Sequence, residues 1–121
     1  MGAFQVQGNY IYRLIAANSD NPTIVFQGPC NLKSIFWYSV GSTGKFIKIY
    51  NQDTTPSILN TPIFTARMSG TTTSSSVSGF PVEGIFLDDG LSFRLTVNGA
   101  DDDNTAVTAG DVWVWLVYEV V

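Results

Sequence analysis

The stretch DVWVWLVYEVV, residues 111–121, decides the fold class because it is apolar on both faces of an extended strand. Successive side chains of a strand point to opposite faces. One face carries Val112, Val114, Leu116, Tyr118 and Val120, and the other carries Trp113, Trp115 and Val117. An antiparallel sheet usually leaves one face polar. The stretch therefore predicts a strand whose second face is covered by another surface.

Other short runs rich in Val, Ile, Phe, Tyr and Trp alternate with clusters of Gly, Pro, Asn, Asp and Ser, and the apolar period of a helix is missing. The runs predict strands at residues 10–17, 23–27, 31–40, 45–50, 62–68, 76–80, 83–87, 91–97 and 112–120. About eight or nine short strands at this spacing indicate an all-β fold, an antiparallel β-sandwich that is jelly-roll-like. We expect one domain over residues 1–121, with residues 1–9 as an extended N-terminal arm.

The predicted strands differ in how their two faces are filled. In residues 91–97, the apolar side chains alternate with Ser92, Arg94 and Thr96, which we expect to face outward. Residues 31–40 are apolar on both faces, and one face carries Leu32, Phe36, Tyr38 and Val40 while the other carries Ile35 and Trp37. Between strands, VGSTGKF at 40–46 predicts a tight hairpin, and the polar stretch 68–80 predicts a flexible loop at one end of the sandwich.

Charge is sparse and mostly acidic. The chain has six Lys and Arg, ten Asp and Glu and no His, and its charged residues make up 13% of the sequence. It has no basic stripe for nucleic acid and no apolar run of the roughly 20 residues that a membrane helix needs, so we predict neither partner. The N-terminus lacks the features of a secretory signal. The low charge indicates a surface partly covered by other copies or by a larger assembly.

Catalytic constellations are missing from the sequence. Without histidine, Ser-His-Asp triads, Cys-His pairs and most zinc sites are impossible. The single Cys30 has no base to activate it and is expected to be a small buried apolar residue. We therefore predict that the protein is not an enzyme and has no cofactor.

The acidic stretch DDDNTAVTAGD, residues 101–111, has two interpretations. Asp101, Asp103 and Asp111 could contribute oxygen ligands to a weak calcium site, although their spacing does not match a calcium-binding loop. The alternative is a solvated acidic turn without metal, which keeps the entrance to the last strand soluble.

The two-sided strands also have two interpretations. Another segment of the same chain could cover the outer faces, or a second subunit could cover them. For the second case, the candidate interface residues of a homo-oligomer are Trp113, Trp115, Val117, Ile35 and Trp37.

Two stretches carry a resemblance to a known group of proteins. FIKIYNQDTTPSILNTPIFTARM at 46–68 and GIFLDDGLSFRLTVNGADDDNTAVTAGDVWVWLVYE at 84–119 together resemble small proteins of tailed-phage structural gene clusters. The resemblance implies a virion structural protein, specifically a trimeric capsid cement (decoration) protein. It also implies assembly in the host cytoplasm and binding to the major capsid protein on the outer head surface. The matched positions are architectural, among them Tyr50, Pro62, Gly84, Gly90, Asp101, Gly110 and Tyr118.

Two alternatives remain open at this stage. A trimeric tail-fibre or spike receptor-binding domain would share the sandwich and the trimer. A carbohydrate-binding β-sandwich module would use Trp37, Trp113 and Trp115 to stack on sugar rings.

Overall fold

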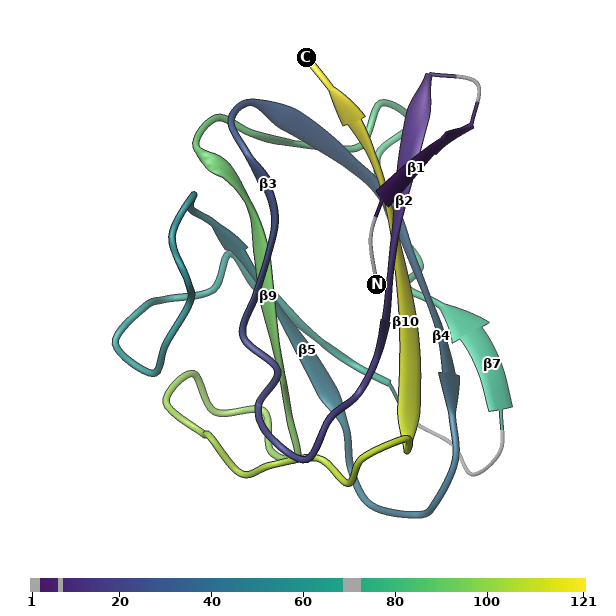
Figure 1. The fold of residues 1–121 in the computed structure, drawn as a ribbon, viewed down its shortest axis with the longest axis vertical. Coiled ribbons are helices and arrows are strands. Elements are labelled where there is room, and N and C mark those ends of the chain that lie inside the picture. The colour runs from purple at the N-terminus through teal and green to yellow at the C-terminus, as the bar shows by residue number, and fades with distance from the viewer. Residues whose placement is uncertain (1–2, 7, 69–72) are drawn as a thin grey trace.

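The computed structural model describes residues 3–6, 8–68 and 73–121, which form two antiparallel sheets without a helix (Figure 1). The six-stranded sheet, called sheet A, has the order β1-β2-β10-β4-β7, with β8 also paired to β4, and the four-stranded sheet B has the order β3-β9-β5-β6. Sheet A contains β1 (Ala3–Val6), β2 (Asn9–Ile15), β4 (Cys30–Ser39), β7 (Thr73–Ser76), β8 (Ile85–Leu87) and β10 (Val112–Val120), and sheet B contains β3 (Thr23–Gln27), β5 (Phe46–Asn51), β6 (Phe64–Arg67) and β9 (Gly90–Thr96). The predicted all-β antiparallel sandwich is confirmed.

The N-terminal segment, expected as an extended arm, contributes a strand. Ala3–Val6 forms β1 and pairs antiparallel with the first half of β2, with Ala3 opposite Tyr12. Residues 1, 2 and 7 lie outside the described part of the chain.

The core lies between the two sheets and is made from the inward side chains of both. Its fully buried members include Leu32, Ile35, Ile47, Ile49, Leu91, Phe93, Leu95, Val112, Val114 and Leu116. Cys30 belongs to the same cluster, and burial raises the pKa of its thiol to about 11. A thiol with this pKa stays neutral at physiological pH, as expected of a structural cysteine.

The predicted hairpin at residues 40–46 is wrong. The strands on either side of it, β4 and β5, belong to different sheets, so the segment crosses the sandwich. β4 has no edge left for β5, because β10 pairs with one side of it and β7 and β8 pair with the other. Lys45 at the end of the crossing is buried and donates from Nζ to the carbonyl oxygen of Thr43 at 2.7 Å.

The Ser/Thr-rich segment, predicted as a flexible loop with a strand at 76–80, contains a strand in a different place. Thr73–Ser76 forms β7 along the edge of β4, opposite Phe36–Ser39. Its side chains are exposed, so the strand leaves no apolar pattern in the sequence and is defined by backbone pairing alone. The part of the predicted loop at 69–72 lies outside the described residues.

The polar face of β9 points away from the core, as predicted, but it is buried. Ser92, Arg94 and Thr96 are each 0% exposed. The loop after β9 folds back over this face, and its backbone carbonyls at Asp101 and Asp103 accept hydrogen bonds from Arg94 at 2.9 and 3.0 Å. The acidic turn is therefore anchored to sheet B through two of its backbone carbonyls.

Arg94 is the centre of this buried network. Besides the two carbonyls, its guanidinium donates to the Asp20 carboxylate at 3.0 Å and to the Tyr50 hydroxyl at 3.0 Å. Arg94 therefore ties the loop 97–111 and the segment before β3 to sheet B. Lys48 on β5 lies directly across from it and donates to the Thr96 hydroxyl at 2.8 Å. Burial and the neighbouring Arg94 lower the pKa of Lys48.

We predict that Arg94→Met lowers the free energy of unfolding by about 3 kcal/mol, because it leaves the Asp20 carboxylate and the Asp101 carbonyl without their donor. The matched control is Lys48→Met, which removes the buried cation directly across from Arg94. It should change stability by about 1 kcal/mol or less, since Arg94 still satisfies the carbonyl of Asp103. Urea unfolding of the three proteins measures this difference, and equal losses in the two variants would contradict it.

Candidate functional site

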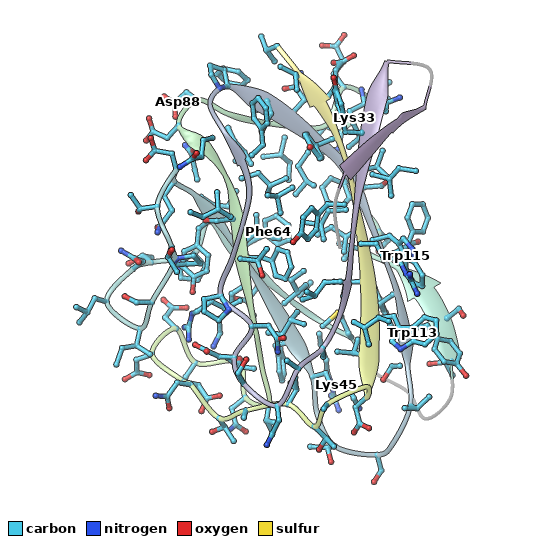
Figure 2. The ribbon with its side chains drawn as sticks, viewed as in Figure 1. Lys33, Lys45, Phe64, Asp88, Trp113 and Trp115 are labelled. Atoms are coloured by element: carbon cyan, nitrogen blue, oxygen red, sulfur yellow. The ribbon has the colours of Figure 1, made fainter. Side chains whose placement is uncertain are left out.

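The outer face of β10 is aromatic and is not buried in the core. Trp113 and Trp115 are half-buried, and their ring centroids are 6.3 Å apart. Tyr38 of β4 packs edge-on against Trp113 at 5.9 Å, and the guanidinium carbon of Arg13 lies 5.2 Å from the centre of the Trp113 ring. These contacts are all between side chains on the same face of sheet A. Figure 2 shows the two tryptophans on the side of the molecule that faces away from sheet B.

Strand register explains which side chains join this face. β2 and β4 flank β10, and residues directly opposite one another in paired strands share a face. The pairs place the following residues around the tryptophans and Val117: Ile11, Arg13 and Ile15 from β2, and Ser34, Phe36 and Tyr38 from β4. Phe36 is 45% exposed. We call this set, with Trp113, Trp115 and Val117, the aromatic face.

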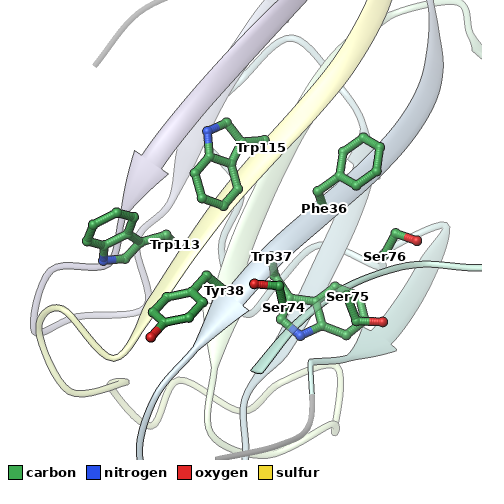
Figure 3. A pocket seen from close by; sticks show the side chains of 8 residues that line it. All are labelled: Phe36, Trp37, Tyr38, Ser74, Ser75, Ser76, Trp113 and Trp115. Atoms are coloured by element: carbon green, nitrogen blue, oxygen red, sulfur yellow. The ribbon is translucent and has the colours of Figure 1, made fainter. Parts of the chain in front are cut away.

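A groove runs along the part of the aromatic face next to β7 (Figure 3). Its volume is about 730 Å³, and it is lined by Phe36, Trp37, Tyr38, Ser74, Ser75, Ser76, Trp113 and Trp115. The aromatic residues come from β4 and β10, and the serines come from β7, where Ser74 and Ser76 share the face of Tyr38 and Phe36. The groove was not predicted from the sequence, because residues 68–80 were expected to form a flexible loop at one end of the sandwich.

The structure shows on which face of sheet A the candidate interface residues lie. Trp113, Trp115 and Val117 lie on the outer face, as the alternation of β10 indicates. Ile35 and Trp37, expected beside them, are 0% and 7% exposed and belong to the core cluster. The reason is a β-bulge: Val117 is opposite Ser34 but Tyr118 is opposite Leu32, so β4 has an extra residue there. Simple alternation along β4 therefore predicts the wrong face for Ile35 and Trp37.

Burial divides the charges unequally between interior and surface. Three of the six cations, Lys45, Lys48 and Arg94, are buried, whereas no Asp or Glu is buried. The accessible cations are Arg13, Lys33 and Arg67. The surface therefore carries ten acidic residues and only three basic residues. In the part of the chain that the structure describes, no carboxylate pairs with Arg13.

The candidate calcium ligands do not converge. Hydrogen bonds from Thr105 and Asn98 hold the Asp103 carboxylate within its own turn, at 2.8 Å from the Thr105 hydroxyl and 3.1 Å from the Asn98 amide. Burial opposes the ionisation of Asp103, but these hydrogen bonds outweigh it and lower its pKa. Asp111 lies beside Gly41, at the other end of the loop. Across residues 3–6, 8–68 and 73–121, no three His, Cys, Asp or Glu side chains are grouped to hold a metal ion.

Comparison of the chain with protein-family models, with curated proteins and with solved structures finds no match. Within the described residues, no helix is long and apolar enough to cross a membrane. The aromatic face is therefore the candidate site, because it presents large apolar rings beside the guanidinium of Arg13. Such a surface can bind another surface or a ligand by packing and stacking.

We predict that EDTA leaves the melting temperature unchanged, because hydrogen bonds within the turn already satisfy the Asp103 carboxylate. Differential scanning calorimetry with EDTA and with added Ca²⁺ measures this. A fall of several degrees in EDTA would restore the calcium interpretation of Asp101, Asp103 and Asp111.

Proposed function

We propose that this protein is a non-enzymatic structural protein that assembles with copies of itself through the aromatic face. The observation that carries the proposal is the outer face of β10, where two tryptophans stand at the centre of a sheet face on which no other strand of the described chain packs. Aromatic residues and arginine are the types enriched at the centres of protein interfaces.

The arrangement of the face suits a protein interface. Trp113 already packs against Trp115, Tyr38 and Arg13, so its side chain loses little entropy on association. Burial of apolar area contributes about 25 cal/mol per Å², before the cost of association is subtracted. Ile11 and Ile15 extend the apolar area on one side, while serines form a polar rim on the other.

For the biological setting, we propose a trimeric capsid cement protein on the outer surface of a tailed-phage head, with the major capsid protein as its second partner. The resemblance of residues 46–68 and 84–119 to phage structural proteins supports this. The strand orders β2-β10-β4-β8 and β3-β9-β5-β6 also support it, because we infer from them a two-sheet jelly roll, an architecture used in viral capsid proteins. Such a protein would assemble in the host cytoplasm and act in the virion.

We expect wild-type protein to form an oligomer that persists in 1 M salt, because the aromatic face is mainly apolar. Trp113→Asp should dissociate it by placing a charge at the centre of the interface. Light scattering at micromolar concentration measures the mass of each form, and circular dichroism shows whether each is folded.

The matched control is Val121→Asp, which introduces the same charge at an exposed apolar residue, 69% accessible, at the end of the chain. It should leave the oligomer intact. A wild-type protein that remains monomeric at all concentrations would refute assembly through the aromatic face.

A second candidate function is glycan binding, as a carbohydrate-binding module or a fibre receptor-binding domain. The groove beside β7 favours it, because serines 74–76 line the same groove as Trp113 and Trp115. Trp37 also lines the groove, and its Nε1 donor is buried without an acceptor among the described residues. Because this nitrogen is itself buried, a glycan would stack on the exposed rings of the groove and would not bond to it.

Glycan binding predicts a saturable change in tryptophan fluorescence when monomeric protein is titrated with oligosaccharides. Trp115→Ala should weaken the binding at least about tenfold, because stacking on its ring is lost. A salt-resistant oligomer with no fluorescence response to any sugar would favour the structural function instead.

A further inference from the structure

The loop that follows β9 contains the dipeptide Asn98-Gly99, and an asparagine followed directly by glycine occurs nowhere else in the chain. The backbone nitrogen after an asparagine can attack the carbonyl carbon of the asparagine side chain, and a side chain on that following residue hinders the attack. Glycine has no side chain to do so. The other asparagines are followed by Tyr, Ser, Pro, Leu, Gln or Thr. Asn98 is therefore the asparagine of this chain whose side-chain amide is least protected from its own backbone.

The structure leaves the backbone nitrogen of Gly99 free to react. Asn98 is exposed, and within the described residues the Gly99 amide donates no hydrogen bond. Such an amide can lose its proton to solvent base without breaking a bond of the fold. Phe46 explains why position 99 is a glycine, since a Cβ there would lie 3.2 Å from its ring. The packing of this loop against β5 therefore favours the residue that also permits the attack on Asn98.

The side-chain amide of Asn98 has a structural role in the acidic turn. Its Nδ2 donates to the Asp103 carboxylate at 3.2 Å and to the Thr105 hydroxyl at 3.5 Å. The backbone amide of Asn98 donates to the same carboxylate at 3.1 Å, and Thr105 donates to it from its backbone and its hydroxyl. Asn98 and Thr105 together therefore hold Asp103 in place. An ionised carboxylate at position 98 would have no hydrogen to donate to Asp103.

The turn that Asn98 closes is also the turn that covers Arg94. The backbone carbonyl of Asp103 accepts from Arg94 at 3.0 Å, and Lys48 Nζ lies 3.4 Å from the same oxygen. The Thr96 hydroxyl donates to the Asn98 carbonyl at 2.7 Å, which joins β9 to the start of the turn. A negative charge at position 98 would face the Asp103 carboxylate, and like charges at this distance repel. The repulsion would act on the residue whose backbone satisfies the buried cations.

We propose that Asn98 is a site of spontaneous deamidation, and that its conversion loosens the loop 97–111 over Arg94. The Gly99 backbone nitrogen loses its proton to solvent base and bonds to the side-chain carbonyl carbon of Asn98. The carbon–nitrogen bond of the side-chain amide breaks, and its nitrogen takes a proton from solvent and leaves as ammonia. Water then opens the resulting succinimide ring to aspartate or isoaspartate. The reaction needs no oxidant, reductant or cofactor.

The conversion is a one-way change, because the ammonia is lost to solvent. Aspartate at position 98 replaces a donor by a charge, and isoaspartate also routes the backbone through the side-chain carbon. Either product would release the turn from the Asp103 carboxylate. In Figure 1 the loop is the yellow-green segment on the side of sheet B that faces away from sheet A. The modification is therefore separate from the aromatic face and goes beyond the proposed self-assembly.

Ageing of the folded wild-type protein at mildly alkaline pH tests the site. Mass spectrometry of proteolytic peptides follows the exchange of ammonia for water at each asparagine, and enzymatic methylation detects isoaspartate. We expect Asn98 to convert before Asn18 and Asn104, which are also exposed but are followed by larger residues. Earlier conversion of either of these would overturn the proposal. An Asn98 that stays intact while a synthetic peptide of residues 95–102 converts would also overturn it.

The effect on the loop is tested with Asn98→Asp and with the aged wild-type protein. Each should melt about 5 °C below fresh wild-type protein, because the turn loses a donor and gains a repulsion. The matched control is Asn104→Asp, which adds the same charge to the same loop at an exposed residue. It should melt within about 2 °C of wild type. Calorimetry measures the four proteins, and equal decreases in Asn98→Asp and Asn104→Asp would overturn the release of the loop.

Light scattering separates the modification from the proposed function. Asn98→Asp should form the same salt-resistant oligomer as wild type, because the loop 97–111 covers sheet B and the aromatic face belongs to sheet A. Loss of the oligomer in this variant would overturn a release confined to the loop. A wild-type oligomer with an intact Asn98 would refute deamidation alone, whereas a wild-type monomer that deamidates at Asn98 would refute assembly alone.

Discussion

The pairing of β10 with β2 on one side and β4 on the other is the interaction on which the rest of the structure depends. Since both edges of β10 are occupied, the directions of its side chains are fixed along its length. Its inward residues close the core against sheet B, and its outward tryptophans form the centre of the aromatic face. A single strand therefore links folding of the sandwich to the surface that we propose for assembly.

The outer face of sheet B is covered by a loop, whereas the outer face of sheet A is not, and the difference is electrostatic. On sheet B, Arg94 is buried and must have acceptors, so the acidic loop and Asp20 are drawn over it. On sheet A, the indole and phenol rings carry no charge that needs acceptors, so no loop of the described chain has to cover them. One face is covered within the chain, and the other stays accessible.

Burial of three cations also shapes the surface. Because Lys45, Lys48 and Arg94 are inside, the accessible charge is more acidic than the net charge of −4 indicates. Acidic surfaces repel one another and limit nonspecific association. Contacts between copies are then expected at an apolar surface, and the aromatic face is the one that we propose for assembly.

By itself, the sequence determined the all-β class, the position of most strands and the two-sided character of β10, because these depend on local periodicity and turn residues. Tertiary structure decided which strands pair, since β4 and β5 are adjacent in sequence but lie in different sheets. It also decided the facing of Ile35 and Trp37 through one bulge, and the burial of Arg94 through a loop folded back on the sheet. These features depend on contacts between distant segments, and no local pattern of residues encodes them.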